Sequence, residues 1–111
     1  MAKKRPNNYG DGIAEVYRKK DIEKNVRSLE DLKYLGFLYF SEKSKRQQDI
    51  EFAQQQGANL TLKISTGDDA EINSNENIVI GDVIYAIIYI DHNRASRELY
   101  IYLEEVRRVE R

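Results

Sequence analysis

The segment "NIVIGDVIYAIIYIDHNRASRELYIYLEEV", residues 77–106, decides the fold class. Its runs of Ile, Val and Tyr are typical of β-strands, and Gly81-Asp82 and the polar residues 92–96 predict turns between them. In the last run, aliphatic side chains alternate with tyrosine or glutamate, which is the pattern of a strand with one buried face. Because the connections are short, these strands are predicted to be antiparallel neighbours.

Three further strands are predicted upstream. In "NLTLKIS", 59–65, the aliphatic side chains are expected to point inward, and Thr61 and Lys63 outward. The run "LKYLGFLYF", 32–40, is apolar on both faces, which favours a strand covered on both sides, and Gly36 predicts a bulge or bend within it. The first strand is predicted in "IAEVYRKKD", 13–21.

These elements predict a mainly β domain, a small antiparallel β-barrel or sandwich of five to six strands with one helical insertion between the second and third main strands. Residues 1–12, with the basic triplet Lys3-Lys4-Arg5, are predicted to be a flexible arm. The domain is expected to span 13–107, and a charged tail 108–111. The strand patterns assign six side chains to the core: Leu38, Leu62, Ile64, Ile87, Leu99 and Ile101.

The insertion, residues 43–57, is polar, rich in glutamine and helix-prone. Ser44 with Gln47 fits a capping box, and Gly57 is placed to end the helix. A surface helix normally buries a broad apolar stripe, but this segment offers mainly Ile50, Phe52 and Ala53. We therefore expect it to lie on the surface or against a neighbouring subunit, and to be mobile in the free subunit.

Composition argues against several classes of protein. The 111 residues have the length of one domain, and without cysteine the sequence holds neither disulfides nor thiolate metal sites. The net charge of −1 argues against a dedicated nucleic-acid binder, and no apolar run is long enough to span a membrane. The one histidine, His92, is expected in an exposed turn beside Asp91, with no nucleophile placed against it. We predict a protein that is not an enzyme, with no catalytic, cofactor-binding or metal-binding residues.

Eight tyrosines are many for this length. Four of them, on the last two long strands, are predicted to lie in the core or in a subunit interface: Tyr85, Tyr89, Tyr100 and Tyr102. Stacking on nucleobases is disfavoured, because residues 77–92 contain no Lys or Arg.

The order of these elements resembles that of the tailed-bacteriophage head–tail joining proteins, also called head completion, head closure or stopper proteins. The likeness covers about residues 11–106. It includes the strands "GIAEVYRKKD" and "LGFLYFSEKS", the insertion "KRQQDIEFAQQQGANLTLKI", the strands "NIVIGDVIYAIIYI" and the terminal strand "RELYIYLEEV". It is a likeness in the order and character of the elements, without a catalytic signature.

The resemblance implies a structural virion protein at the head–tail interface, assembled in the cytoplasm of a bacterial host. Copies of it would form a ring below the portal, dodecameric as in the family. The ring would extend and close the DNA channel and provide the tail-attachment surface. The implied partners are further copies of the chain, a portal or adaptor protein, a tail or tail-completion protein, and packaged double-stranded DNA without sequence specificity; no membrane is implied.

By the same resemblance, the insertion faces the channel. The residues given this role are Lys43, Lys45, Arg46, Gln47, Gln48, Asp49, Glu51, Gln54, Gln55 and Gln56. Their mixed charge leaves open whether the insertion repels or grips DNA. The alternative, from a different class, is a monomeric oligonucleotide-binding β-barrel, which salt-dependent binding to short single strands would favour.

Overall fold

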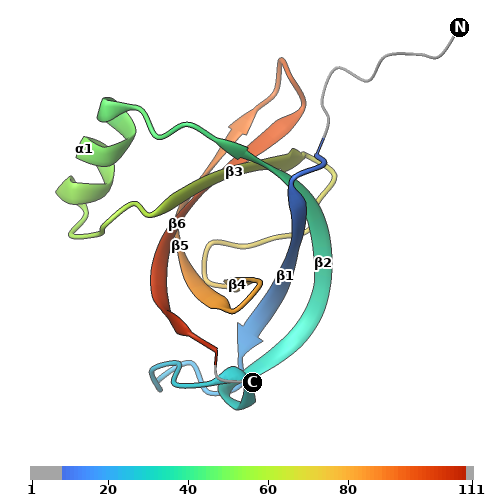
Figure 1. Ribbon diagram of the computed structural model, residues 1–111, viewed down its shortest axis with the longest axis vertical. Coiled ribbons are helices and arrows are strands. Elements are labelled where there is room, and N and C mark those ends of the chain that lie inside the picture. Colours follow the sequence, from blue (N-terminus) through green and yellow to red (C-terminus); the bar gives the residue numbers. More distant parts are fainter. Residues whose placement is uncertain (1–8, 110–111) are drawn as a thin grey trace, which may run out of the picture.

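The computed structural model describes residues 9–109, which fold into a β-barrel with one α-helix beside it (Figure 1). The elements are β1 (Gly12–Lys19), a 3-10 helix η1 (Leu29–Asp31), β2 (Leu32–Lys43), α1 (Gln47–Gln55), β3 (Leu62–Gly67), β4 (Asn77–Ile80), β5 (Val83–Asn93) and β6 (Glu98–Arg108).

All of these strands belong to one antiparallel sheet, which closes in the order β1-β2-β3-β6-β5-β4. The short strand β4 completes the barrel by pairing with β1, where Glu15 lies opposite Val79. Helix α1 lies in the connection between β2 and β3 and projects from one side of the barrel (Figure 1). The predicted fold class is therefore confirmed, including the position of the helical insertion.

The predicted turns also form. Gly81, with a φ of 59°, begins the tight turn between β4 and β5, and glycine adopts this left-handed conformation at no steric cost. In the pairing of β1 with β2, Val16 lies opposite Gly36 but Tyr17 lies opposite Tyr34, so Leu35 is an extra residue. The bulge expected at Gly36 is thus present one residue before it.

The first and last strands begin and end close to the bounds predicted for the domain. Of the predicted arm, residues 1–8 lie outside the described residues, and β1 already begins at Gly12. At the other end, β6 continues to Arg108, and Val109 is buried with Val26, Leu32 and their neighbours. The last strand therefore ends one residue beyond 107, and Val109 packs just after it; residues 110–111 lie outside the described residues.

The main core fills the barrel interior with aliphatic side chains from every strand. Four of the six predicted core residues are buried: Leu38, Ile64, Leu99 and Ile101. Leu62 and Ile87 are only partly buried, but they pack against this core.

The structure corrects two expectations about which strand residues are covered. Lys63 does point away from the barrel interior, but it is 6% exposed because α1 covers that part of β3. The strand β2 is not covered on both sides, because Tyr34, Phe37 and Tyr39 are each about half exposed. Their neighbours Leu38 and Phe40 point into the core, so β2 buries one face.

Candidate functional site

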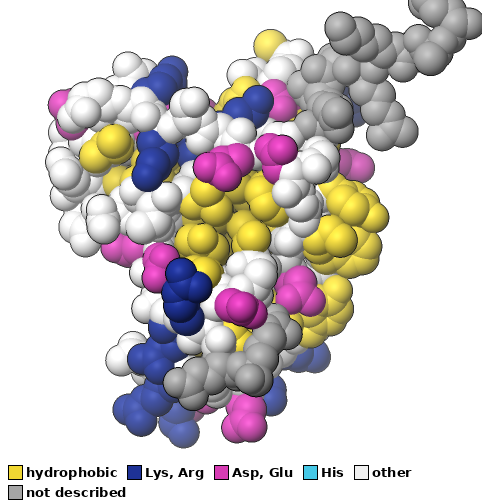
Figure 2. Space-filling model, viewed as in Figure 1, with side chains coloured by type: hydrophobic (Ala, Val, Ile, Leu, Met, Phe, Trp, Pro, Cys, Tyr) yellow, Lys and Arg dark blue, Asp and Glu magenta, His cyan; other side chains and the backbone are white. Residues whose placement is uncertain are grey.

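The outer face of β1 and β2 carries a group of exposed apolar side chains, which we call the aromatic face: Ile13, Tyr34, Leu35, Phe37 and Tyr39. Ile13 lies directly opposite Tyr39 across the strand pair, so the two side chains share one side of the sheet. Apolar side chains gather over the position of β2, at the right of Figure 2. Phe37 is 53% and Tyr39 58% exposed. Exposed apolar side chains gathered on one face make it a candidate interaction surface.

The three rings of this face each pack against another aromatic ring. Phe37 and Tyr39 meet edge to face, with ring centroids 5.5 Å apart and an angle of 89° between the planes. Tyr34 makes a similar contact with Tyr17, at 5.4 Å and 70°. The sequence signal for this face was the two-sided apolar run at 32–40, which we interpreted as burial within one chain.

Helix α1 lies on another side of the barrel (Figure 1). A buried ionic cluster fixes it there. The Asp49 carboxylate accepts hydrogen bonds from Lys63 Nζ at 3.0 Å and from the Tyr102 hydroxyl at 3.3 Å. Arg46 adds contacts from its guanidinium at 3.2 and 3.3 Å and from its backbone N–H at 3.0 Å. The ammonium of Lys63 also lies over the rings of Tyr100 and Tyr102. Asp49 and Lys63 are both buried, so their charges are compensated within the protein.

The cluster changes the acidity of its members. Burial alone would raise the pKa of Asp49, but hydrogen bonds from Arg46 and Lys63 outweigh it and hold that pKa well below its usual range. Burial, with the nearby Asp49 charge, raises the pKa of Tyr102 to about 12. At neutral pH the cluster therefore contains an ionised Asp49 carboxylate and a neutral Tyr102 phenol.

The same residues correct two expectations about the insertion. The N-cap residue of α1 is Arg46, and its backbone N–H donates a hydrogen bond to the Asp49 carboxylate. The predicted capping pair, Ser44 and Gln47, does not occupy these positions. The predicted helix end is confirmed, because Gly57 follows the last turn with a φ of 72°.

The insertion has more to hold it than the sequence indicated. Ala53 is buried with Leu60 and Tyr102, and Ile50 packs against this small cluster. Phe52 meets Tyr89 edge to face, with centroids 5.2 Å apart. Mobility of the insertion in the free subunit stays a prediction, and these contacts oppose it.

Of the ten residues predicted to face a channel, all except Asp49 are exposed. Asp49 cannot face a channel while α1 is docked, because its carboxylate points at the barrel. Among the exposed ones, Lys45 donates a hydrogen bond to the Thr61 carbonyl, and Gln47 donates one to Glu51.

The four predicted interface tyrosines have different surroundings. Tyr102 is buried beneath α1, Tyr85 packs against the main core, and Tyr100 is half-buried with its hydroxyl donating to Glu98. Tyr89 is 42% exposed and lies beside Phe52. Tyr89 is therefore the member of the set with the largest area left for another subunit.

His92 lies at the end of β5 rather than in the turn, and its Nε2 is 3.1 Å from Asp68, not paired with Asp91. Arg97 adds a longer contact to Asp68, at 3.9 Å. The groups meet because the chain leaving β3 passes the β5–β6 turn, which sequence spacing does not reveal. Within residues 9–109, no group of three or more His, Cys, Asp or Glu side chains is arranged to hold a metal ion.

Comparison with known proteins finds no matching protein-family model and no matching curated sequence. Within residues 9–109, the one α-helix lacks the length and apolar character needed to cross a lipid bilayer.

Proposed function

We propose that this chain is a structural virion protein of the head–tail connector, acting as one subunit of a ring below the portal. The observation that carries the proposal is the separation of two surfaces on one small barrel. The aromatic face lies on β1 and β2, while the polar helix α1 projects from a different side (Figures 1 and 2). A ring subunit needs both an apolar surface for a neighbour and a hydrated surface for the lumen.

The charges on the insertion favour contact with DNA over repulsion. The exposed charged residues of the predicted channel set are Lys43, Lys45, Arg46 and Glu51, three positive and one negative, which leaves +2. Asp49 does not change this balance, because its charge is matched by buried Lys63. Each copy in a ring would then present cations to the phosphates, giving affinity without sequence specificity.

The alternative, a monomeric oligonucleotide-binding barrel, has one observation in its favour: aromatic rings on an open strand face are the platform on which bases stack. Two features of the aromatic face weaken it. Phe37 and Tyr39 pack edge to face, so the edge of one ring already lies against the face of the other, where a base would stack. The residue opposite Phe37 on β1 is Glu15, whose charge repels phosphate.

Sedimentation velocity over a range of concentrations tests the proposal. We expect weak self-association that is lost on replacing Phe37→Ser with Tyr39→Ser. The control is Ile22→Ser with Val106→Ser, which removes two exposed apolar side chains outside the aromatic face and should leave association unchanged. A strictly monomeric chain that binds short single strands in a salt-dependent way would overturn the proposal in favour of the alternative. The gene should also lie between portal or capsid genes and tail genes.

A further inference from the structure

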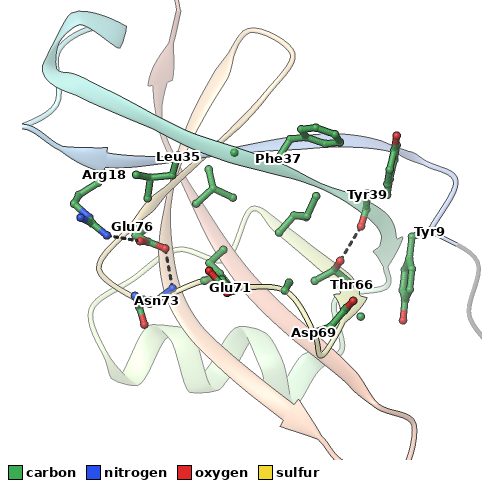
Figure 3. Close-up of a pocket in the computed structure, with 16 residues that line it drawn as sticks. Tyr9, Arg18, Leu35, Phe37, Tyr39, Thr66, Asp69, Glu71, Asn73 and Glu76 are labelled. Carbon is green, nitrogen blue, oxygen red and sulfur yellow. Dashed lines mark hydrogen bonds and ion pairs between the residues drawn. The ribbon is translucent and has the colours of Figure 1, made fainter.

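A groove of about 1020 Å³ runs between β2 and the segment that follows β3, residues 67–76 (Figure 3). Its two walls differ in chemistry, because one is formed by a strand that carries exposed rings and the other by a polar connection. The labelled side chains of Figure 3 that form these walls are Leu35, Phe37 and Tyr39 from β2, and Asp69 and Glu71 from the segment.

The strand β2 has a free backbone edge along this groove. It pairs with β3 only from Ser41 to Lys43, and within residues 9–109 no strand is in register with 35–40 on the side away from β1. The Tyr39 carbonyl points into the groove, because it accepts a hydrogen bond from the Thr66 hydroxyl at 2.8 Å. Alternate residues of a strand present their backbone groups to the same edge, so Phe37 also turns its N–H and carbonyl to the groove. Such an edge can pair with an added strand.

The segment 67–76 covers the core beside this edge without pairing with it. Ala70 and Ile72 pack against the main core, whereas Asp69 and Glu71, which alternate with them, are exposed. Within the described part of the chain, no ladder of backbone hydrogen bonds joins the segment to β2. The place of a neighbouring strand beside residues 35–40 is therefore open.

The groove is acidic. Asp69 and Glu71 are exposed, and no ion pair within residues 9–109 involves either of them. Glu76 is already matched by Arg18, at 3.6 Å. The three carboxylates and one guanidinium leave −2 along the groove. The exposed aromatic rings of β2 on the opposite wall also attract cations.

These features favour a cationic peptide over other occupants. A second copy of β2 would bring its own Asp69 and Glu71 to the groove, and repulsion between like charges would oppose the pairing. The phosphates of a nucleic acid would be repelled by the same carboxylates. The free edge, residues 35–40, matches about 20 Å of extended chain.

We infer that the groove is a docking site for an extended, cationic segment of another protein, which adds to the free edge of β2 as a further strand. Its backbone bonds to Phe37, and its lysine or arginine side chains lie beside Asp69 and Glu71. Side chains of a strand alternate between two faces, so cations on one face leave the other face for apolar side chains. The inference rests on the edge and the charge of the groove and does not depend on the proposed connector function.

Binding of a synthetic peptide to the full-length chain tests this inference. The probe is a capped peptide of about eight residues in which lysine alternates with valine, slightly longer than the free edge. NMR follows hydrogen exchange of the β2 amides. We expect saturating peptide to slow exchange of the Phe37 amide at least about tenfold, because the amide becomes bonded within a strand pair. A peptide with glutamate in place of lysine should leave that exchange unchanged.

Two variants of the protein test the role of charge. Asp69→Asn with Glu71→Gln should weaken binding of the lysine peptide about tenfold, because two exposed ion pairs are lost. The matched control, Asp21→Asn with Glu30→Gln, makes the same two chemical changes at exposed positions outside the groove and should keep the wild-type affinity. Equal affinities of these two variants would overturn the inference, because the groove carboxylates would then have no local role.

Methylation of alternate backbone nitrogens in the peptide tests strand pairing itself. Only every second N–H of an added strand faces β2, so methylating either all lysines or all valines should abolish binding of one version and spare the other. Equal binding of the two versions would overturn the inference, because attraction between charges does not distinguish alternate amides. So would protection of the Phe37 amide that grows with protein concentration in the absence of peptide, because a second copy would then occupy the groove.

Discussion

The ionic cluster that fixes α1 gives the sharpest single test of the structure. Asp49→Asn keeps the shape of the side chain and removes the charge that compensates Lys63. The two side chains are 5% and 8% exposed, so Lys63 would be left as a buried, unmatched cation. Breaking a buried ion pair by removing one partner costs about 3–5 kcal/mol. The contact with Arg46 adds little to this, because that guanidinium is 59% exposed.

The assay is urea denaturation at neutral pH, followed by far-UV circular dichroism. We expect the free energy of unfolding to fall by about 3–5 kcal/mol in Asp49→Asn. The control is Glu51→Gln, the same chemical change two residues along α1 at an exposed position, which should stay within about 0.5 kcal/mol of the wild type. Adding Lys63→Met to Asp49→Asn removes the stranded charge and should recover most of the loss.

Acidification provides an independent check with a defined sign. The pKa of Asp49 is lower in the folded protein than its ordinary value. Its stabilisation is therefore complete above about pH 5 and is lost as the pH falls through the folded-state pKa. The wild type should lose more stability on acidification than Asp49→Asn does.

A loss below about 1 kcal/mol for Asp49→Asn at neutral pH, the size expected for a solvated ion pair, would show that α1 is not docked in the free subunit.

Three further predictions follow from the barrel. Ile64→Ala, at a fully buried site, should cost about 2–5 kcal/mol in urea denaturation, and partly buried Leu62→Ala should cost less; equal losses would contradict the burial assigned to β3. In a spectrophotometric titration, Tyr9 and Tyr102 should ionise near pH 12. Because folding raises these two pKa values, their contribution to stability is present below about pH 10 and is lost above it. Normal titration of all tyrosines would argue against the hydroxyl contacts of Tyr9 with Glu98 and of Tyr102 with Asp49. Replacing residues 45–56 with a short Gly-Ser link removes Asp49 and also the helix that covers Lys63, so the Lys63 ammonium becomes hydrated. The barrel should then still melt cooperatively. If this deletion variant is unfolded, α1 is required for folding of the barrel.

The sequence determined the elements because their signals are local. The strand pattern of 97–106, the Gly81-Asp82 turn and the Gly57 helix end each depend on residues within a few positions of one another, and a strand, a turn and a helix end form at these positions. The position of the helical insertion followed from the same signals.

The tertiary structure decided which surfaces are covered and by what. Lys63 has the alternation of an outward-facing residue, yet it is buried, because α1 folds back over β3 and brings Asp49 to it. The run 32–40 has the composition of a strand buried on both faces, yet Phe37 and Tyr39 are exposed, because no element of residues 9–109 covers that side of the barrel. Burial depends on partners far away in the chain, such as Asp49 with Tyr102, so the pattern of one strand cannot supply it.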